Sequence, residues 1–221
     1  MPATPPSQYR FHIPDGAGDL VGTGADLDPG TLLAAYRSGL FPMGLGPDGQ
    51  EPLGWWSPDP RGVLLAGGIH LSRSLQRSRR RFTVTTDAAT AQVLDGCADP
   101  DRPGRWITPQ VRAAYLRLAE LGWVHSVEVW QDGRLAGGLY GVCVGGLFAG
   151  ESMFHTVTDA SKVALAALAD IVYADADERR LIDVQWSTPH LATLGVVEIP
   201  RREYLDRLAV AVQLPWPARW R

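Results

Sequence analysis

The sequence predicts an α+β fold with a small N-terminal lobe, residues 1–60, and a larger domain, residues 61–221, that contains a mixed, mainly antiparallel sheet. Three observations lead to this prediction. Three β-rich runs follow one another and are joined by Asp132-Gly133 and Gly145-Gly146, which are strong hairpin signals. Helical patterns with capping residues flank these runs. A proline-rich segment just before residue 61 separates them from a beginning rich in Gly, Pro and Asp.

The first 60 residues contain one clear helix. Residues 1–27 lack periodicity, so we expect irregular structure there. Asp28-Pro29 is typical of an N-cap followed by the first helical residue, and Gly39 ends the helix. Residues 41–54 are predicted to form a Gly- and Pro-rich loop. The prolines of Trp55–Arg61 predict a rigid connector to the larger domain.

The larger domain begins with a strand and two helices. Phe82–Thr86 alternates and is rich in β-formers, and Asp87 is a candidate cap for a helix that runs to about Gly96. Thr108-Pro109 predicts the start of a second helix, which should end at Gly122.

The remaining elements alternate in type. We expect three successive strands, a helix capped by Thr158 or Asp159, a strand, a short helix, a strand and a last helix. Their ranges are His125–Trp130, Arg134–Val144, Leu147–Phe154, the helix through Leu165 to Ile171, Leu181–Gln185, Pro189–Leu194, Val196–Ile199 and the helix from Arg201.

This order of elements is that of acyl-CoA N-acyltransferase (GNAT-like) domains, which deliver an activated acyl group to an amine. Members that use coenzyme A bind its pyrophosphate on a Gly-rich loop before the helix that follows the fourth strand. The corresponding segment here, Glu151–Ser161, has no glycine, and Glu151 and Asp159 would repel a diphosphate. We therefore expect no coenzyme A or other cofactor, and an acyl group carried by something else.

The composition is that of an ordinary globular protein, with 45% hydrophobic and 20% charged residues and a formal net charge of −3. No apolar run approaches the roughly 18 residues of a membrane span, and the N-terminus lacks a basic head and apolar core, so we expect a cytoplasmic protein without membrane contact. Cys97 and Cys143 are predicted to be buried thiols. The five histidines are scattered, and no metal site is expected. Without an exposed heptad pattern, we expect a monomer.

One segment is strongly basic. Residues 62–86 have no acidic side chain but contain five arginines, at positions 73, 77, 79, 80 and 81. Such a cluster suits a partner with closely spaced phosphates, because each arginine that meets a phosphate releases counterions. The alternative is a solvated helix face, and the run alone favours neither.

Many short segments resemble one family, the bacterial leucyl/phenylalanyl-tRNA–protein transferases. They are collinear and extend from about residue 28 to residue 205, so that together they are specific. The segments are Ala35–Pro42, Trp55–Arg61, His70–Ser74, Trp106–Thr108, His125–Trp130, Gly137–Gly141, Phe148–Phe154, Ala160–Lys162, Leu181–Gln185 and Leu194–Arg201.

The resemblance implies an aminoacyltransferase that moves Leu or Phe, and Met less well, from aminoacyl-tRNA to the α-amine of proteins beginning with Arg or Lys. The added residue then marks the acceptor for degradation as an N-degron. The resemblance also implies the two-part organisation described above.

The resemblance implies catalytic roles for Asp183, Gln185 and Glu151. Asp183 and Gln185 alternate along a strand and should project from the same face. The family pair orients and activates the incoming amine, with the Asp polarising the Gln; because an amide is a poor base, we favour positioning over proton abstraction. An α-amine has a pKa of about 8 and needs no strong base. The alternative is a strand end whose polar groups satisfy backbone donors. Glu151 should bind the acceptor's ammonium or its Arg/Lys side chain, or else is a solvated turn residue.

The resemblance also implies the surfaces that bind the tRNA. The aminoacyl pocket would be lined by Leu139, Phe148, Met153, Leu165 and Leu168, which by composition alone are ordinary core residues. The terminal adenosine would stack on Tyr36 and Trp106, and Tyr115 is a further candidate. The acceptor stem would bind Arg77, Arg79, Arg80 and Arg81 through its phosphates. Two positions depart from the family pattern: Met43 stands where tryptophan is frequent, and Leu168 replaces a larger aromatic residue.

Two alternative functions are compatible with parts of the sequence, and a third is not. A coenzyme A-dependent N-acetyltransferase would bind acetyl-CoA and ignore charged tRNA. A non-enzymatic RNA-binding module would keep the arginine cluster and lose nothing on changing Asp183 or Gln185. A serine hydrolase is rejected, because Gly150-Glu151-Ser152 lacks the second glycine of a nucleophile elbow and neither His155 nor His190 has a defined place beside the serine.

Overall fold

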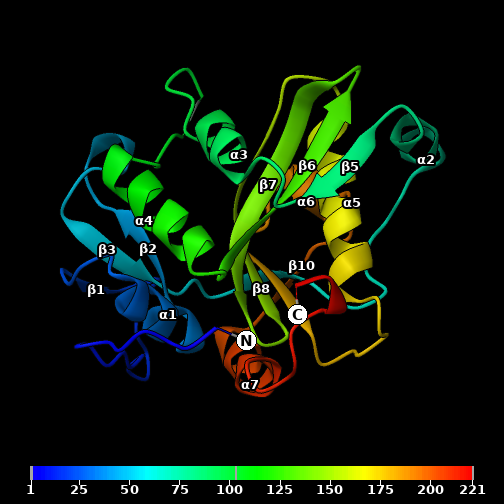
Figure 1. The fold of residues 1–221 in the computed structure, drawn as a ribbon. Helices are drawn as coiled ribbons and strands as arrows, with labels where there is room; N and C mark the ends of the chain where they lie inside the picture. Colours follow the sequence, from blue (N-terminus) through cyan, green and yellow to red (C-terminus); the bar gives the residue numbers. More distant parts are fainter. Residues whose placement is uncertain (1, 103, 221) are drawn as a thin grey trace.

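A small sheet occupies the N-terminal part of the computed structural model, which describes residues 2–102 and 104–220. Its strands are β1 (Leu20–Thr23), β2 (Phe41–Gly44) and β3 (Leu53–Trp56), in the order β1-β3-β2 (Figure 1). The irregular structure expected for residues 1–27 and the loop expected for 41–54 are therefore wrong in part. Each strand has only four residues, and Pro42 lies in an edge strand, where a missing N–H is tolerated.

The larger sheet has seven strands in the order β10-β4-β9-β8-β7-β6-β5. All neighbours are antiparallel except β8 and β9, which confirms the predicted α+β class with a mixed, mainly antiparallel sheet. Strand β4, which follows the proline-rich segment, was not predicted. The strands are β4 (Arg61–Leu64), β5 (Thr83–Thr86), β6 (Val124–Gln131), β7 (Arg134–Val144), β8 (Leu147–His155), β9 (Leu181–Gln185) and β10 (Val197–Ile199).

Helices cover both faces of this sheet (Figure 1). On β7, a Cβ at Gly138 would lie 3.0 Å from Val93 of α3, and one at Gly137 would lie 2.8 Å from Ala160 of α5, so the two helices pack closely on opposite faces. From β5 onward the elements follow the predicted order, which confirms the acyltransferase-like arrangement. The helices are α1 (Pro29–Arg37), α2 (Arg73–Arg79), α3 (Thr90–Cys97), α4 (Pro109–Glu120), α5 (Ala160–Val172), α6 (Pro189–Ala192) and α7 (Arg201–Ala211), with short 3₁₀ turns η1 (Pro47–Gly49) and η2 (Ala218–Trp220).

The helix ends test the predicted caps. Thr108 caps α4 by accepting a bond from the N–H of Val111, and Gly122 follows the helix with a φ of 79°. Asp87 does not cap α3, which begins three residues later; its carboxylate instead accepts from the backbone N–H of Ser126 at 2.8 Å. None of the helices in residues 2–102 and 104–220 combines the length and apolarity that a membrane crossing requires.

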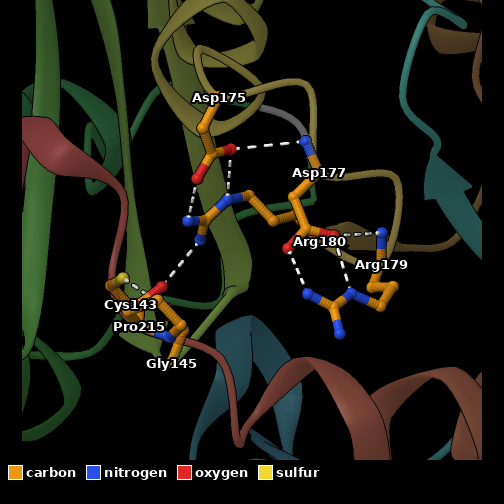
Figure 2. A network of polar contacts seen from close by, with 7 residues as sticks. All are labelled: Cys143, Gly145, Asp175, Asp177, Arg179, Arg180 and Pro215. Carbon is orange, nitrogen blue, oxygen red and sulfur yellow. Dashed lines mark hydrogen bonds and ion pairs between the residues drawn. The ribbon is translucent and has the colours of Figure 1, made fainter.

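A buried arginine links the start of β9 to the C-terminal segment (Figure 2). Arg180 donates from Nε to Asp175 at 2.8 Å and from Nη1 to the carbonyl of Pro215 at 2.8 Å. These bonds fix the residue that precedes β9. They hold one end of the strand whose other end carries Asp183 and Gln185.

Candidate active site

A cavity of about 400 Å³ lies where β8 and β9 separate. The two strands pair in parallel only as far as Ala149 and Asp183, so the later residues of each strand line a space between them. Most of the lining is apolar and comes from β2, β7, β8, β9, α5 and α6. The apolar residues are Phe41, Pro42, Met43, Trp106, Leu139, Met153, Leu165, Leu168, Ile182, Val184, Trp186 and Leu191.

The predicted aminoacyl pocket agrees with this lining at four positions out of five. Leu139, Met153, Leu165 and Leu168 all line the cavity. Phe148 does not, because it is fully buried before the strands part and its ring stacks on Trp220 at 5.4 Å between centroids. The structure therefore does not bring Phe148 to the cavity.

Glu151 reaches the cavity because β8 has a bulge at this point. Tyr140 pairs with Ser152 and Gly141 pairs with Gly150, which leaves Glu151 as an extra residue. Bulges re-aim side chains in this way beside many active sites. The Oε2 atom of Glu151 accepts a hydrogen bond from the Tyr115 hydroxyl at 2.9 Å. The other oxygen, Oε1, is buried without a hydrogen-bond partner among the described residues.

The surroundings of Glu151 bring the pKa of its carboxyl group close to neutral pH. Burial raises the pKa of this carboxyl group from 4.5 to about 7, although the nearby hydroxyls of Tyr36 and Tyr115 act in the opposite direction. A carboxyl group with this pKa binds a cation in its ionised form and is readily protonated when no cation is present.

Tyr36 and Tyr115 lie behind Glu151 and not on an exposed surface. Their hydroxyls are 2.5 Å apart, and both side chains are buried. Since Tyr115 donates to Glu151, Tyr36 donates to Tyr115. Burial raises the pKa of both phenols well above the usual value, so both remain neutral. Their ring faces are covered, and the expected stacking on an adenosine does not fit their position here.

Gln185 lines the cavity because of a turn at the end of β9, and not because of the regular alternation of the strand. Its φ is 60°, and the N–H of Trp186 bonds to the carbonyl of Val184 at 2.8 Å across it, which is the geometry of a γ-turn. The turn breaks the alternation of the strand, so that Gln185 joins Val184 in the cavity wall while Asp183 is absent from it. The expectation that Asp183 and Gln185 share a face is wrong. The Nε2 atom of Gln185 is buried without a partner among the described residues.

Asp183 is completely buried in a polar cluster on the other side of the strand. Its carboxylate accepts from Arg61 through Nε at 2.9 Å and Nη2 at 2.7 Å, from the Tyr204 hydroxyl at 2.9 Å and from the backbone N–H of Gln185 at 2.9 Å. The side chains of Arg61 and Asp183 are each 1% exposed. Burial lowers the pKa of Arg61, but the charge of Asp183 outweighs it, and the pKa lies above its usual value.

Aromatic side chains flank the cavity on the side of the small sheet. Trp106 and Met43 both line the cavity and are partly exposed. Met43 is the residue that stands where tryptophan is frequent in the family. Trp186 is 39% exposed and packs edge-on against Phe41, with 5.1 Å between ring centroids. Trp106 is thus the one residue of the three predicted for adenosine stacking that the structure brings to the cavity.

The predicted basic cluster lies on α2 and the turn that follows it. Arg77, Arg80 and Arg81 are exposed, while Arg79 pairs with Asp170 of α5 at 2.6 Å. Helix α5 also supplies Leu165 and Leu168 to the cavity, so the basic cluster and the cavity share one helix. The geometry fits both an anion-binding surface and a solvated helix face.

The sequence of this chain matches two family profiles. Residues 25–59 match the leucyl/phenylalanyl-tRNA protein transferase N-terminal domain, and residues 63–209, more than half of the chain, match leucyl/phenylalanyl-tRNA protein transferase. The chain belongs to the leucyl/phenylalanyl-tRNA–protein transferase family. The predicted resemblance is therefore confirmed.

Relatives named as members of this family match nearly the whole chain. The leucyl/phenylalanyl-tRNA–protein transferase of Azoarcus sp. (strain BH72) is 50% identical over 224 residues, which cover 99% of this chain and 92% of that protein. The protein of the same name from Stutzerimonas stutzeri (strain A1501) is 47% identical, and the match covers 98% of this chain and 94% of that protein.

Similarity to solved structures is weaker. A GCN5-related N-acetyltransferase from Kribbella flavida aligns with a TM-score of 0.39 and 12% identity over 77% of this chain and 60% of that chain. A tandem GNAT protein from the clavulanic acid biosynthesis pathway aligns with a TM-score of 0.38 and 16% identity, over 82% of this chain and 58% of that chain. The family assignment does not depend on these alignments.

Several residues around the cavity were not predicted from the sequence. Arg61 and Tyr204 enclose Asp183, and Trp186 and Arg102 line the cavity. Tyr36 and Tyr115 were predicted for adenosine stacking, whereas the structure places them behind Glu151. The only signal for Arg61 was its place at the end of the proline-rich segment Trp55–Arg61. Tyr204 belongs to the last helix and carries no local signal at all.

Proposed function

We propose that this chain is an aminoacyltransferase that moves Leu or Phe, and Met less well, from aminoacyl-tRNA to the α-amine of proteins with N-terminal Arg or Lys. One observation carries the proposal: the 400 Å³ apolar cavity has two buried polar atoms without partners among the described residues, Glu151 Oε1 and Gln185 Nε2. Buried polar atoms are nearly always paired, so these two atoms are suited to a polar substrate. Membership of the family supplies the substrate class.

The donor's side chain would occupy the apolar part of the cavity, against Leu139, Met153, Leu165 and Leu168. Discrimination by such a surface is worth only about 1–3 kcal/mol per methylene group, which fits a site that accepts Leu, Phe and Met. The terminal adenosine would stack on Trp106, the one predicted stacking residue that lines the cavity, where it is partly exposed.

The reaction is the attack of an α-amine on an ester. The amine nitrogen bonds to the ester carbonyl carbon, the bond from that carbon to the ribose oxygen breaks, and the amine's proton ends on the ribose hydroxyl. Glu151 would hold the acceptor through an ammonium or guanidinium group, because this residue lines the cavity, its Oε1 has no partner among the described residues, and its ionised form is acceptor-only. Gln185 would orient the amine and the ester carbonyl by hydrogen bonds of its amide.

The same proposal includes the setting of the reaction. The acceptor stem would lie on Arg77, Arg79, Arg80 and Arg81. The proposal also includes the division into residues 1–60 and 61–221 and a monomeric state. It further includes a cytoplasmic location, where charged tRNA and new N-termini meet. Addition of Leu or Phe would create an N-degron on the acceptor.

A product assay tests the proposal directly. The protein is mixed with leucyl-tRNA and with peptides that begin with Arg, Lys or Ala, and the products are weighed. We expect one added leucine on the Arg and Lys peptides and none on the Ala peptide. Leucine on all three peptides would contradict the acceptor assignment, and acetylation from acetyl-CoA without any leucine transfer would favour the coenzyme A-dependent alternative.

A second prediction concerns the basic cluster. Replacing Arg79, Arg80 and Arg81 with glutamine should weaken tRNA binding and lower the slope of log K against log salt by about 0.7–0.9 for each phosphate contact that is lost. The matched control replaces Arg202 and Arg207 of α7, which lies at the other end of the molecule (Figure 1). Equal slopes for the cluster variant and the wild type would show that phosphates are held elsewhere.

A further inference from the structure

The end of β9 has a backbone conformation that its sequence does not favour. Gln185 has a φ of 60°, a region in which a residue with a side chain costs roughly 1–2 kcal/mol. The turn brings the chain close to β4, where Gly62 is the partner of Gln185; a Cβ at Gly62 would lie 2.8 Å from the backbone nitrogen of Ser187. Such a conformation persists only where surrounding groups hold it.

The group that holds the turn is the Asp183 carboxylate. Its Oδ1 atom accepts the backbone N–H of Gln185 at 2.9 Å, so the carboxylate ties down the residue at the centre of the turn. The same oxygen receives Nε of Arg61, and Oδ2 receives Nη2 of Arg61 and the hydroxyl of Tyr204. The carboxylate is thereby fixed from three directions.

Arg61 is itself held in place by the rest of the molecule. Its Nη1 donates to the carbonyl of Gly39 at 3.2 Å, and its guanidinium lies 5.0 Å from the ring centre of Phe41 and 4.3 Å from that of Tyr204. A bidentate arginine is the most rigid partner that a carboxylate has in proteins. The cluster therefore couples the position of the segment between α1 and β2, of β4 and of α7 to the turn at Gln185.

The contacts also restrict what Asp183 does. It touches Gln185 at the backbone N–H, whereas the side-chain Nε2 of Gln185 has no partner among the described residues. The charge of Asp183 is balanced by the paired guanidinium, and no atom of Asp183 lines the cavity. Direct polarisation of the Gln185 amide by Asp183 does not fit these contacts.

We infer that Arg61 and Tyr204 are positioning residues for the transfer reaction: with Asp183 they lock the γ-turn that aims the Gln185 amide into the cavity, and Asp183 acts by holding the backbone, not by its charge. The inference rests on the proposed function for its catalytic part. The lock itself is a property of the fold.

Charge-neutral replacement separates positioning from a charge effect. Asp183→Asn alone leaves Arg61 charged and unpaired, and we expect single-turnover leucine transfer to fall at least thirtyfold. In the double variant Arg61→Gln/Asp183→Asn no charge is unpaired, and the asparagine oxygen still accepts the Gln185 N–H. We expect the double variant to transfer leucine within about tenfold of the wild type, with the affinity for leucyl-tRNA unchanged. A double variant that folds and is as inactive as Asp183→Asn would overturn the inference.

Tyr204→Phe provides a second test that keeps both charges. We expect a several-fold fall in kcat at unchanged KM and an unchanged pH profile. Tyr173→Phe is the matched control: its partly buried hydroxyl also bonds to the backbone of β4 and β9, at Leu64 and Ile182, but has no hydrogen bond with Asp183. An equal fall in kcat for Tyr173→Phe would mean that the loss of any hydroxyl at these strands has the same effect, and would count against the lock.

Amide hydrogen exchange tests the lock without reference to activity. In Tyr204→Phe the Gln185 amide should exchange at least fivefold faster than in the wild type, whereas in Tyr173→Phe the change should occur at Ile182 and spare Gln185. Unchanged exchange at Gln185 in Tyr204→Phe would refute the lock. If the wild type transferred no leucine while the exchange result held, the proposed function would fail and the structural part of the inference would stand.

Discussion

The Asp183→Ala variant should lose about 3–5 kcal/mol of unfolding free energy, because a buried charge whose partner is removed stays uncompensated. Arg61 is 1% exposed, and a guanidinium keeps its proton even when it is buried, so the charge remains in the variant. Urea titration of the variant and the wild type measures the difference. At temperatures where the variant is folded, transfer of labelled leucine to an Arg-initiated peptide should fall at least thirtyfold, with tRNA affinity nearly intact.

The matched control for this prediction is Asp175→Ala. Asp175 also pairs with a buried arginine, Arg180, but the Asp175 side chain is 43% exposed (Figure 2). Water can therefore replace the carboxylate, and Arg180 keeps its bond to the carbonyl of Pro215. We expect a loss of about 1 kcal/mol for this variant, in the range of solvent-exposed pairs. Equal losses for the two variants would mean that burial of the pair is not what makes Asp183 important.

The elements that could be predicted are those whose own sequence, or the turn beside it, indicates the structure. Strands β6, β7 and β8 are long and are separated by Asp132-Gly133 and Gly145-Gly146, and α4 has both a capping threonine and a terminating glycine. The four-residue strands β1 to β4 have no such signals. They exist because a partner strand lies beside each of them, as Val63 of β4 lies beside Asp183 of β9, and a partner of this kind is 120 residues away in the sequence.

Most of the residues that line the cavity could be predicted from the sequence, but the directions in which their side chains point could not. Leu139, Met153, Leu165, Leu168, Glu151 and Gln185 were expected at the cavity and line it. The regular alternation of a strand predicts that Asp183 and Gln185 lie on the same face of β9. This fails because Gln185 has a positive φ, which cannot be recognised from the sequence. The bulge that turns Glu151 inwards depends in the same way on the register of β7 and β8. Tyr115 was expected to stack on a base because an aromatic residue looks the same in sequence whether its hydroxyl or its ring face carries the function.

Replacing Glu151 with glutamine should remove the contribution of this residue to the pH dependence of stability between about pH 4.5 and pH 7. The native state has a pKa of about 7 at this residue and the unfolded chain one of about 4.5. Between these values the native state binds more protons, so the unfolding free energy of the wild type falls as pH rises. This stabilisation is complete below about pH 4.5 and is lost by about pH 7. The glutamine side chain does not titrate, so the stability advantage of the variant over the wild type should grow from near zero at pH 4.5 to about 3 kcal/mol above pH 7.

The same substitution should cost activity, which separates a functional carboxylate from a merely buried one. If ionised Glu151 holds the acceptor's cation, kcat/KM of the wild type should rise with pH through about 7, and Glu151→Gln should lack this rise and transfer leucine at least tenfold more slowly at pH 8. Glu120→Gln, an exposed change at the end of α4, is the control for both measurements. A stabilised Glu151→Gln variant with wild-type turnover would show that the acceptor is held by another group. A variant that is slower but has the wild-type pH dependence would assign the titration to the acceptor's own amine.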